Sequence, residues 1–278
     1  MFSQLTGALV RALLIVVLIA TPSLMLPGVP SDTTQIVALV ALFAAALTFF
    51  EYASTYPGLV EFRDAPPFNR LRFLSLFVTV LILSTIVRGE VMPTTLTTFI
   101  EALGSRLGEV IDVPYSPVRL VVLMLPEGMS LKHLMLVRTT AGIAYVISLL
   151  TLVFFVVAMR AIGWPNRMGS FNVWINLPTF DPTTGGDVVD RLQRDARFNI
   201  ALGFLLPFLI PASVKLASLA FSPVTLESPQ TLIWTMTAWA FLPASLFMRG
   251  IAMGRIAGMI AEKRKRSNAP TNPDLVPA

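Results

Sequence analysis

Six long apolar stretches, nearly empty of ionisable side chains, dominate this sequence. Each is close to the roughly 20 residues that a helix needs to cross a hydrocarbon core of about 30 Å. Backbone N–H and C=O groups in lipid must be paired within their own segment, and a helix achieves this. We therefore predict an all-α integral membrane protein with six transmembrane helices. The stretches cover residues 8–27, 35–51, 71–87, 139–158 and 200–221, and the last begins near residue 231.

Composition supports the same fold class and excludes several kinds of chemistry. Hydrophobic residues make up 55% of the chain and charged residues 13%, whereas soluble domains carry about a quarter charged residues. The chain contains no Cys and one His, His133. Disulfides, thiolate nucleophiles and Cys-ligated zinc are thereby excluded, and a multi-histidine metal site or a His pair for haem cannot be built. We expect no metal and no cofactor.

The connecting segments divide by charge and predict an orientation. Fifteen basic residues lie on the side of both termini, five lie on the other side and Lys215 lies within a span, which accounts for all 21. An excess of Lys and Arg marks cytoplasmic segments. We therefore expect both termini in the cytoplasm, with the protein in a bacterial inner membrane. The first span is interrupted by Arg11 alone and has a long apolar run, so we interpret it as a retained helix.

Residues 1–266 are interpreted as one transmembrane domain with two long connections. In the outer segment, 88–138, apolar residues recur at helical spacing around Phe99 and Leu107, which predicts an amphipathic helix lying on the membrane. Residues 117–126 follow it, and their pattern fits either a strand or an interfacial helix. The inner loop, 163–199, combines aromatic residues with a turn, after which Asp187 is expected to cap a short polar helix. Its aromatic residues are Trp164, Phe171, Trp174 and Phe180.

The sixth span is expected to continue as a helix to Glu262 and to project from the membrane. Four cations follow at once, and clustered cations just inside a membrane attract anionic lipid headgroups. They are Lys263, Arg264, Lys265 and Arg266. The tail, 267–278, is expected to be disordered. No basic face carries elements that could recognise nucleic acid, so we expect none among the partners.

Small residues provide the candidate helix-packing positions. Gly250, Gly254 and Gly258 are spaced by four residues, so they share one helix face that another backbone can approach closely. The partner is either a helix of the same chain, which is the simpler interpretation, or another subunit. Ala41 and Ala45 provide a weaker contact of the same kind.

Lys215 is the candidate intramembrane charge, because it alone lies well inside a predicted span. Sixteen residues separate it from Asn199 at the inner boundary, which corresponds to about 24 Å of helix. That distance places it near the outer interface, where a long side chain can reach the headgroups. We therefore favour a boundary position over a functional charge.

No catalytic residue is assigned, because the spans lack a central Asp, Glu or His and no nucleophile motif is present. We expect a non-enzymatic accessory, scaffold or assembly subunit of a membrane protein complex, with membrane lipids and other integral membrane proteins as partners. The alternative is a carrier or permease for a small uncharged or apolar solute. A lipid-modifying enzyme is the third interpretation, and it would need a polar site around residues 181–197.

Overall fold

The computed structural model describes residues 2–63, 65–165, 176–181, 183 and 185–267, and every regular element among them is an α-helix. Six helices are long and apolar enough to span a membrane, namely α1, α2, α3, α6, α8 and α9. The predicted six-helix integral membrane protein is therefore confirmed. The helices are α1 (Phe2–Met25), α2 (Ser31–Ala53), α3 (Pro66–Gly89), α4 (Thr95–Ile111), α5 (Pro117–Met124), α6 (Leu131–Ile162), α8 (Val188–Ala217) and α9 (Pro229–Ser267).

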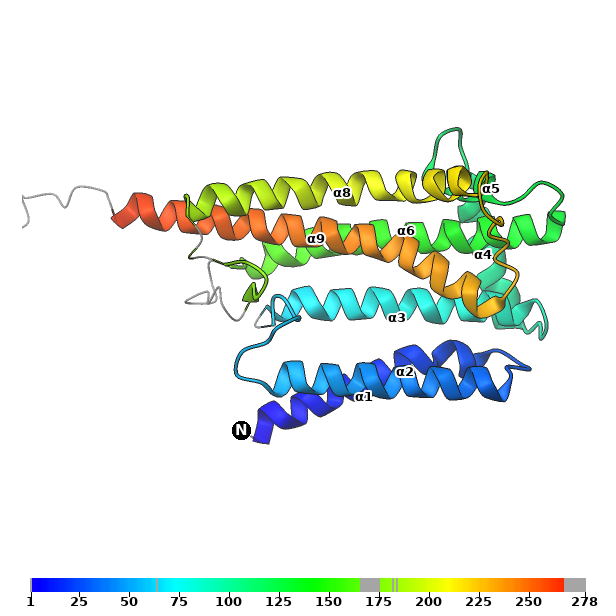
Figure 1. Cartoon of the computed structure of the whole chain (residues 1–278), viewed down its shortest axis with the longest axis horizontal. Helices are drawn as coiled ribbons and strands as arrows, with labels where there is room; N and C mark the ends of the chain where they lie inside the picture. Colours follow the sequence, from blue (N-terminus) through cyan, green and yellow to red (C-terminus); the bar gives the residue numbers. More distant parts are fainter. Residues whose placement is uncertain (1, 64, 166–175, 182, 184, 268–278) are drawn as a thin grey trace, which may run out of the picture.

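The long helices lie side by side, and α1 begins at the same end of the molecule at which α9 ends (Figure 1). We call this the basic end and the opposite one the far end. Helix α9 is central, since it packs against α8, α6 and α3. The antiparallel α1–α2 hairpin lies at the edge of the molecule and is attached chiefly through α1, which contacts α3 (Figure 1). The four helices α3, α6, α8 and α9 form what we call the central bundle.

Two apolar clusters hold the central bundle together. One lies toward the far end and joins α3, α5 and α6 to the first half of α9. The other lies toward the basic end, where the rings of Phe62 and Phe68 are 4.2 Å apart and those of Phe68 and Phe155 are 5.6 Å apart. All three side chains are at most 1% exposed. This second cluster ties the loop after α2 to α3 and α6, and so fixes that loop against the bundle.

Two prolines lie inside α8, Pro207 and Pro211. A proline nitrogen has no hydrogen to donate, so Pro211 leaves the carbonyl of residue 207, one turn earlier, without its usual helical partner. The indole Nε1 of Trp239 on α9 donates to this carbonyl oxygen at 3.1 Å. The break in α8 is therefore compensated by its neighbouring helix, as buried backbone groups in a membrane require.

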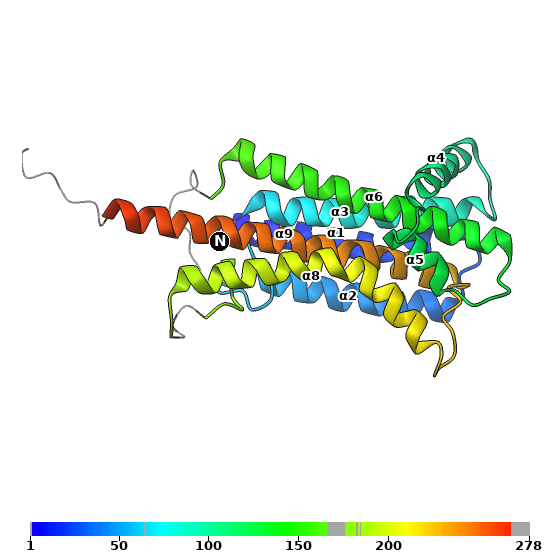
Figure 2. The same ribbon diagram turned by 90° about the horizontal axis from the view of Figure 1, so that it is seen from above.

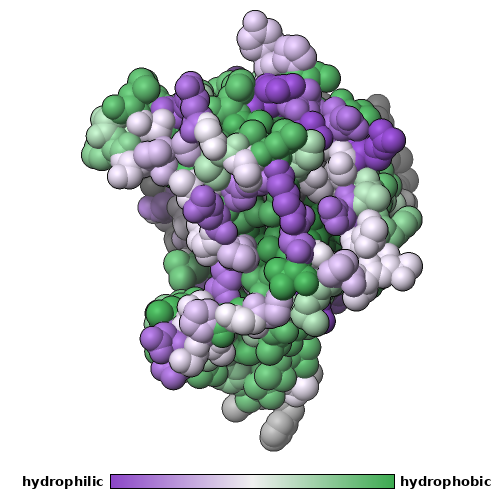
Figure 3. All heavy atoms as spheres, turned by 90° about the vertical axis from the view of Figure 1, so that its right-hand side faces the viewer, coloured by the Kyte–Doolittle hydropathy of each residue, from purple (hydrophilic) through white to green (hydrophobic). Residues whose placement is uncertain are grey.

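At the far end, α4 runs across the bundle, and the predicted amphipathic helix is present (Figures 1 and 2). Its buried side includes Gly104 and Gly108, and a Cβ at Gly142 of α6 would collide with the backbone of Gly108. Its opposite side exposes Leu96, Phe99 and other apolar residues. Polar and apolar side chains are interspersed over the far end of the molecule (Figure 3).

Several predicted boundaries change in the structure. Residues 117–124 are helical, as α5, which decides between the strand and the helix that the sequence allowed. Asp187 caps a helix as predicted, but this helix is α8 itself, continuous through the fifth span rather than short and separate. Helix α9 includes residue 267, and the remainder of the predicted tail, 268–278, lies outside the described residues. Phe171 and Trp174 of the inner loop lie outside them as well.

Candidate functional site

A large cavity lies at the basic end, between the α1–α2 hairpin and α3. Its volume is about 1120 Å³, and its walls come from α1, the end of α2, the loop after α2 and the first three turns of α3. This loop, residues 54–65, is folded by the carboxylate of Glu51, which accepts hydrogen bonds from the backbone N–H groups of Gly58, Leu59 and Val60. The cavity is therefore formed where the hairpin joins the bundle.

Four arginines line this cavity, namely Arg11, Arg63, Arg70 and Arg72. Arg11 and Arg72 belong to membrane-spanning helices, whereas Arg63 comes from the loop. The guanidinium of Arg11 lies 4.5 Å from the centre of the Tyr52 ring, and its Nη1 donates to the carbonyl of Gly7 at 2.8 Å. The guanidinium of Arg72 lies 5.3 Å from the Phe68 ring centre. Its Nε is buried and has no hydrogen-bond partner among the described residues.

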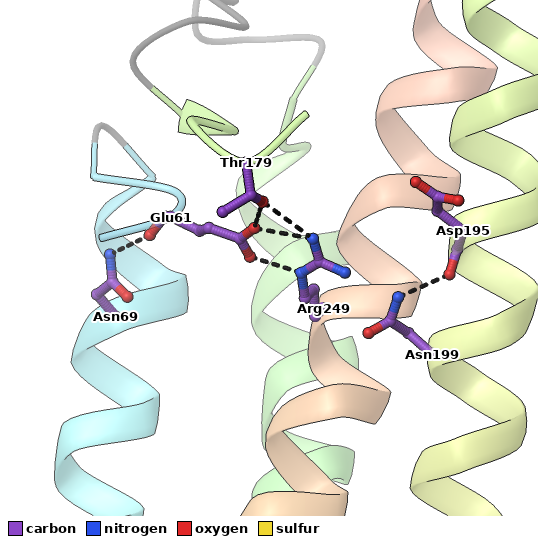
Figure 4. Close-up of polar contacts among 6 residues, drawn as sticks. All are labelled: Glu61, Asn69, Thr179, Asp195, Asn199 and Arg249. Carbon is purple, nitrogen blue, oxygen red and sulfur yellow. Dashed lines mark hydrogen bonds and ion pairs between the residues drawn. The ribbon is translucent and has the colours of Figure 1, made fainter. Parts of the chain in front are cut away.

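Glu61 is the carboxylate of the cavity wall, and it is bound by Arg249 of α9 (Figure 4). Arg249 donates to it through Nε at 2.6 Å and through Nη2 at 2.8 Å, which is a bidentate pair. The hydroxyl of Thr179 donates to the same carboxylate at 2.7 Å. The Asn69 side chain donates to the backbone carbonyl of Glu61 at 2.9 Å. Glu61 is bound by Arg249 and also interacts electrostatically with Arg72, so this one carboxylate is shared between Arg249 and the cavity arginines.

A second feature of this region is the outward face of α2. The only helix that α2 contacts extensively among the described elements is α1. Five of its exposed apolar residues follow the alternating spacing of three and four residues that brings side chains onto one seam of a helix. They are Ile36, Leu39, Phe43, Ala46 and Phe50. We call this row the α2 seam.

The glycines predicted for helix packing differ in their surroundings. A Cβ on Gly250 would lie 2.7 Å from the carbonyl oxygen of Ala196, so Gly250 permits the close approach of α8 and α9. At Gly254 the nearest atom would be the Ala196 Cβ, at 3.8 Å, and at Gly258 nothing lies within 4 Å. The same approach requires Gly203, which the sequence analysis did not single out. A Cβ there would lie 2.7 Å from the Pro243 oxygen.

The other residues predicted from the sequence do not line the cavity. Ala41 is buried and Ala45 half-buried in α2, on the face opposite the seam. The four cations Lys263, Arg264, Lys265 and Arg266 are exposed in the last turns of α9. Of these, Arg264 binds the Asp187 carboxylate at 2.6 Å. Lys215 is exposed in the last turn of α8, at the far end of the molecule.

The arginine cavity and the Glu61–Arg249 pair are not among the features predicted from the sequence. One signal was available: Arg11 interrupts the first span and Arg72 follows the start of the third, so both lie a few turns inside the same end of their helices. That the two helices face each other across a cavity is a tertiary feature. The pairing of Glu61 with Arg249, which are 188 residues apart, has no counterpart in local sequence pattern.

Comparisons with protein-family models, with curated proteins and with solved structures give no match to this chain. No group of three or more His, Asp or Glu residues that could hold a metal occurs within the described residues. Function is therefore inferred from the geometry of the hairpin and its cavity.

Proposed function

We propose that this protein is a non-enzymatic accessory or assembly subunit of a membrane protein complex, and that the α1–α2 hairpin is its docking element. The observation that carries the proposal is the position of α2. Among the described helices α2 packs extensively on α1 alone, and its seam residues Ile36, Leu39, Phe43 and Phe50 are each more than 60% exposed. Neither of the two apolar clusters of the central bundle contains a residue of α2.

The occupant that we propose for the α2 seam is a transmembrane helix of a different protein. Alternating spacing of three and four residues suits a helix that crosses at about 20°, as in left-handed bundles. Ala46, between Phe43 and Phe50, provides a shallow position into which a partner side chain fits. A soluble partner is disfavoured because the seam lies within a span and is uncharged throughout.

We further propose that the basic end faces the cytoplasm and that the membrane is a bacterial inner membrane. The charge asymmetry of the connecting segments supports this orientation. We do not propose the carrier of a small uncharged solute, because the large cavity beside the hairpin is lined by four arginines. An uncharged solute gains nothing from such a lining.

A steric substitution in the seam tests the docking proposal. Ala46→Trp fills the shallow position, whereas Val153→Trp introduces the same side chain at an exposed position of α6. Tagged chains are purified from native membranes in a mild detergent, and the stoichiometry of any second membrane protein is measured. We expect a stoichiometric partner with the wild type and with Val153→Trp, and its loss with Ala46→Trp.

Three results would contradict the proposal. A self-contained particle of the wild-type chain argues that no partner docks. A partner retained by Ala46→Trp argues that docking uses another surface. Cross-linking of two differently tagged copies through cysteines placed at position 43 would identify the occupant as a second copy of this chain instead.

A further inference from the structure

The cavity arginines Arg11 and Arg72 lie within membrane spans, where an ionised side chain without a partner is energetically costly. Arg11 is in the third turn of α1 and Arg72 in the second turn of α3, and both helices are membrane spans. Ionisable side chains inside spans face a cavity or a partner and mark binding sites. Here both face the same cavity from opposite walls. Arg11 contacts the ring and the hydroxyl of Tyr52 and the carbonyl of Gly7. Arg72 lies over the Phe68 ring, and its buried Nε has no hydrogen-bond partner among the described residues.

The lining has a surplus of positive charge. Arg63 is held by the carbonyls of Ser54 and Thr55 and lies near the Glu51 carboxylate. The other lining arginines, Arg11, Arg70 and Arg72, face the Glu61 carboxylate, which Arg249 and Thr179 already bind. Guanidinium groups collected in a partly desolvated space repel one another unless an anion lies between them. Their planar donor pattern matches phosphate oxygens, with which arginine forms bidentate hydrogen bonds. The remaining excess of cations therefore favours an anion in the cavity, and the donor geometry suits a phosphate group.

The same cavity has an apolar wall that a free anion would not use. This wall consists of Val10, Leu14 and Ile15 of α1 and Phe73 and Leu74 of α3. Along α1 the cavity lining runs from Thr6 to Ile15, which corresponds to about 14 Å of helix. Val10 is 51% exposed, Leu14 41% and Leu74 55%. Because these residues lie within spans, the cavity opens toward the surface that lipid covers.

We propose that this cavity binds the phosphate headgroup of an anionic phospholipid from the surrounding leaflet. Arg11 and Arg72 contact the phosphate oxygens, and Arg70 adds a cation at the mouth. The acyl chain lies along Val10, Leu14 and Leu74. A cavity of about 1120 Å³ is somewhat larger than the 300–1,000 Å³ typical of small-molecule sites, and it accommodates a headgroup together with the first part of a chain. Basic pockets between transmembrane helices are known to bind anionic headgroups.

The experiment measures lipid retention by the full-length chain. The purified protein in neutral detergent is mixed with phosphatidylglycerol, with phosphatidylcholine or with inorganic phosphate, and bound molecules are counted by native mass spectrometry. We expect one retained phosphatidylglycerol per chain, weaker retention of phosphatidylcholine, and no displacement by millimolar inorganic phosphate. Arg72→Gln and Arg11→Gln should each weaken phosphatidylglycerol binding about tenfold or more, since each loses charge-assisted hydrogen bonds.

The control is Arg197→Gln, which removes an exposed arginine from α8 at the same basic end, outside the cavity lining. It should bind the lipid as the wild type does. Thermal unfolding of each variant shows whether it is folded. If Arg72→Gln does not fold, Arg11→Gln still tests the proposal, because Arg11 is at an exposed position. Equal binding by Arg11→Gln and Arg197→Gln would overturn the proposal. Full displacement by inorganic phosphate would overturn it too, because the occupant would then be a free phosphate compound.

Discussion

At the scale of single residues, Trp239 explains how α8 tolerates a proline inside the membrane. Its indole N–H satisfies the Pro207 carbonyl, and its ring stacks on Tyr145 with centroids 5.8 Å apart. Trp239→Phe keeps an aromatic ring and removes the donor. We expect the free energy of unfolding to fall by about 1–2 kcal/mol, because a buried carbonyl loses its partner. A lower melting temperature in detergent would show this.

Trp234→Phe is the matched control, since Trp234 lies on the same helix and is only partly buried. We expect it to melt close to the wild type. Equal melting temperatures for the two variants would mean that the Pro207 carbonyl does not depend on Trp239.

Asp187, just outside the span of α8, provides a prediction about pH. A hydrogen bond from Arg264, together with the backbone N–H groups of Val189 and Asp190, holds the pKa of its carboxyl below the usual range. A lowered pKa means that the charged form is favoured in the folded protein. The ion pair between Asp187 and Arg264 of α9 is therefore fully formed at neutral pH. It is lost only as the pH falls through that lowered pKa.

The titration of Asp187 can be followed by carboxyl-selective NMR. We expect a midpoint below the ordinary range near about 4, and an upward shift in Arg264→Gln. Arg266→Gln, two residues further along the same exposed turns, should leave the midpoint unchanged. An unshifted midpoint in Arg264→Gln would show that the cap alone lowers the pKa.

At the scale of helices, Gly203 and Gly250 determine how closely α8 and α9 pack. A Cβ at Gly250 would meet Ala196 and Ile200 of α8 at 2.7 Å, whereas a Cβ at Gly258 would meet nothing within 4 Å. Gly250→Ala should therefore lower the free energy of unfolding by about 1–3 kcal/mol, because the helices must move apart. Gly258→Ala should be neutral or slightly stabilising, because alanine is the better helix former.

Thermal unfolding of the two alanine variants in one detergent compares them directly. The pair separates packing from helix propensity, since both changes lie on α9 two turns apart. If both variants melt like the wild type, the α8–α9 contact does not require a glycine at position 250.

At the scale of the whole molecule, the Glu61–Arg249 pair links the hairpin's loop to the last helix. The Arg249 side chain is 25% exposed and that of Glu61 13%, so neither is fully hydrated. Glu61→Gln keeps the shape and removes the charge. We expect the free energy of unfolding to fall by about 1.5–3 kcal/mol, the usual contribution of hydrogen bonds to charged groups.

Asp187→Asn is the comparison for this prediction. It removes the charge from the exposed pair with Arg264 and keeps a residue that caps helices well. Its melting temperature should change little, because exposed ion pairs contribute little to stability. An equally small change in Glu61→Gln would show that the Arg249 pair is not structural.

The sequence predicts the spans well because hydrophobicity and length determine where a helix can cross lipid. It also predicts the Asp187 cap, which depends on neighbouring residues alone. It does not predict that Arg11 and Arg72 share a cavity, because their distance depends on how the hairpin sits against α3. Likewise Gly250 and Gly258 are equivalent in spacing, and only the path of α8 distinguishes them.

The large separation of Glu61 and Arg249 along the sequence also has a consequence for biosynthesis. The two residues are 188 positions apart, so at 5–20 residues per second a ribosome needs about 10–40 s to add the second after the first. Throughout that interval the newly inserted hairpin has no α9 to hold its loop. The contact that completes the cavity wall is thus among the last to form during synthesis of this protein. A chain whose synthesis stalls before the final helix remains in the membrane with an incomplete site.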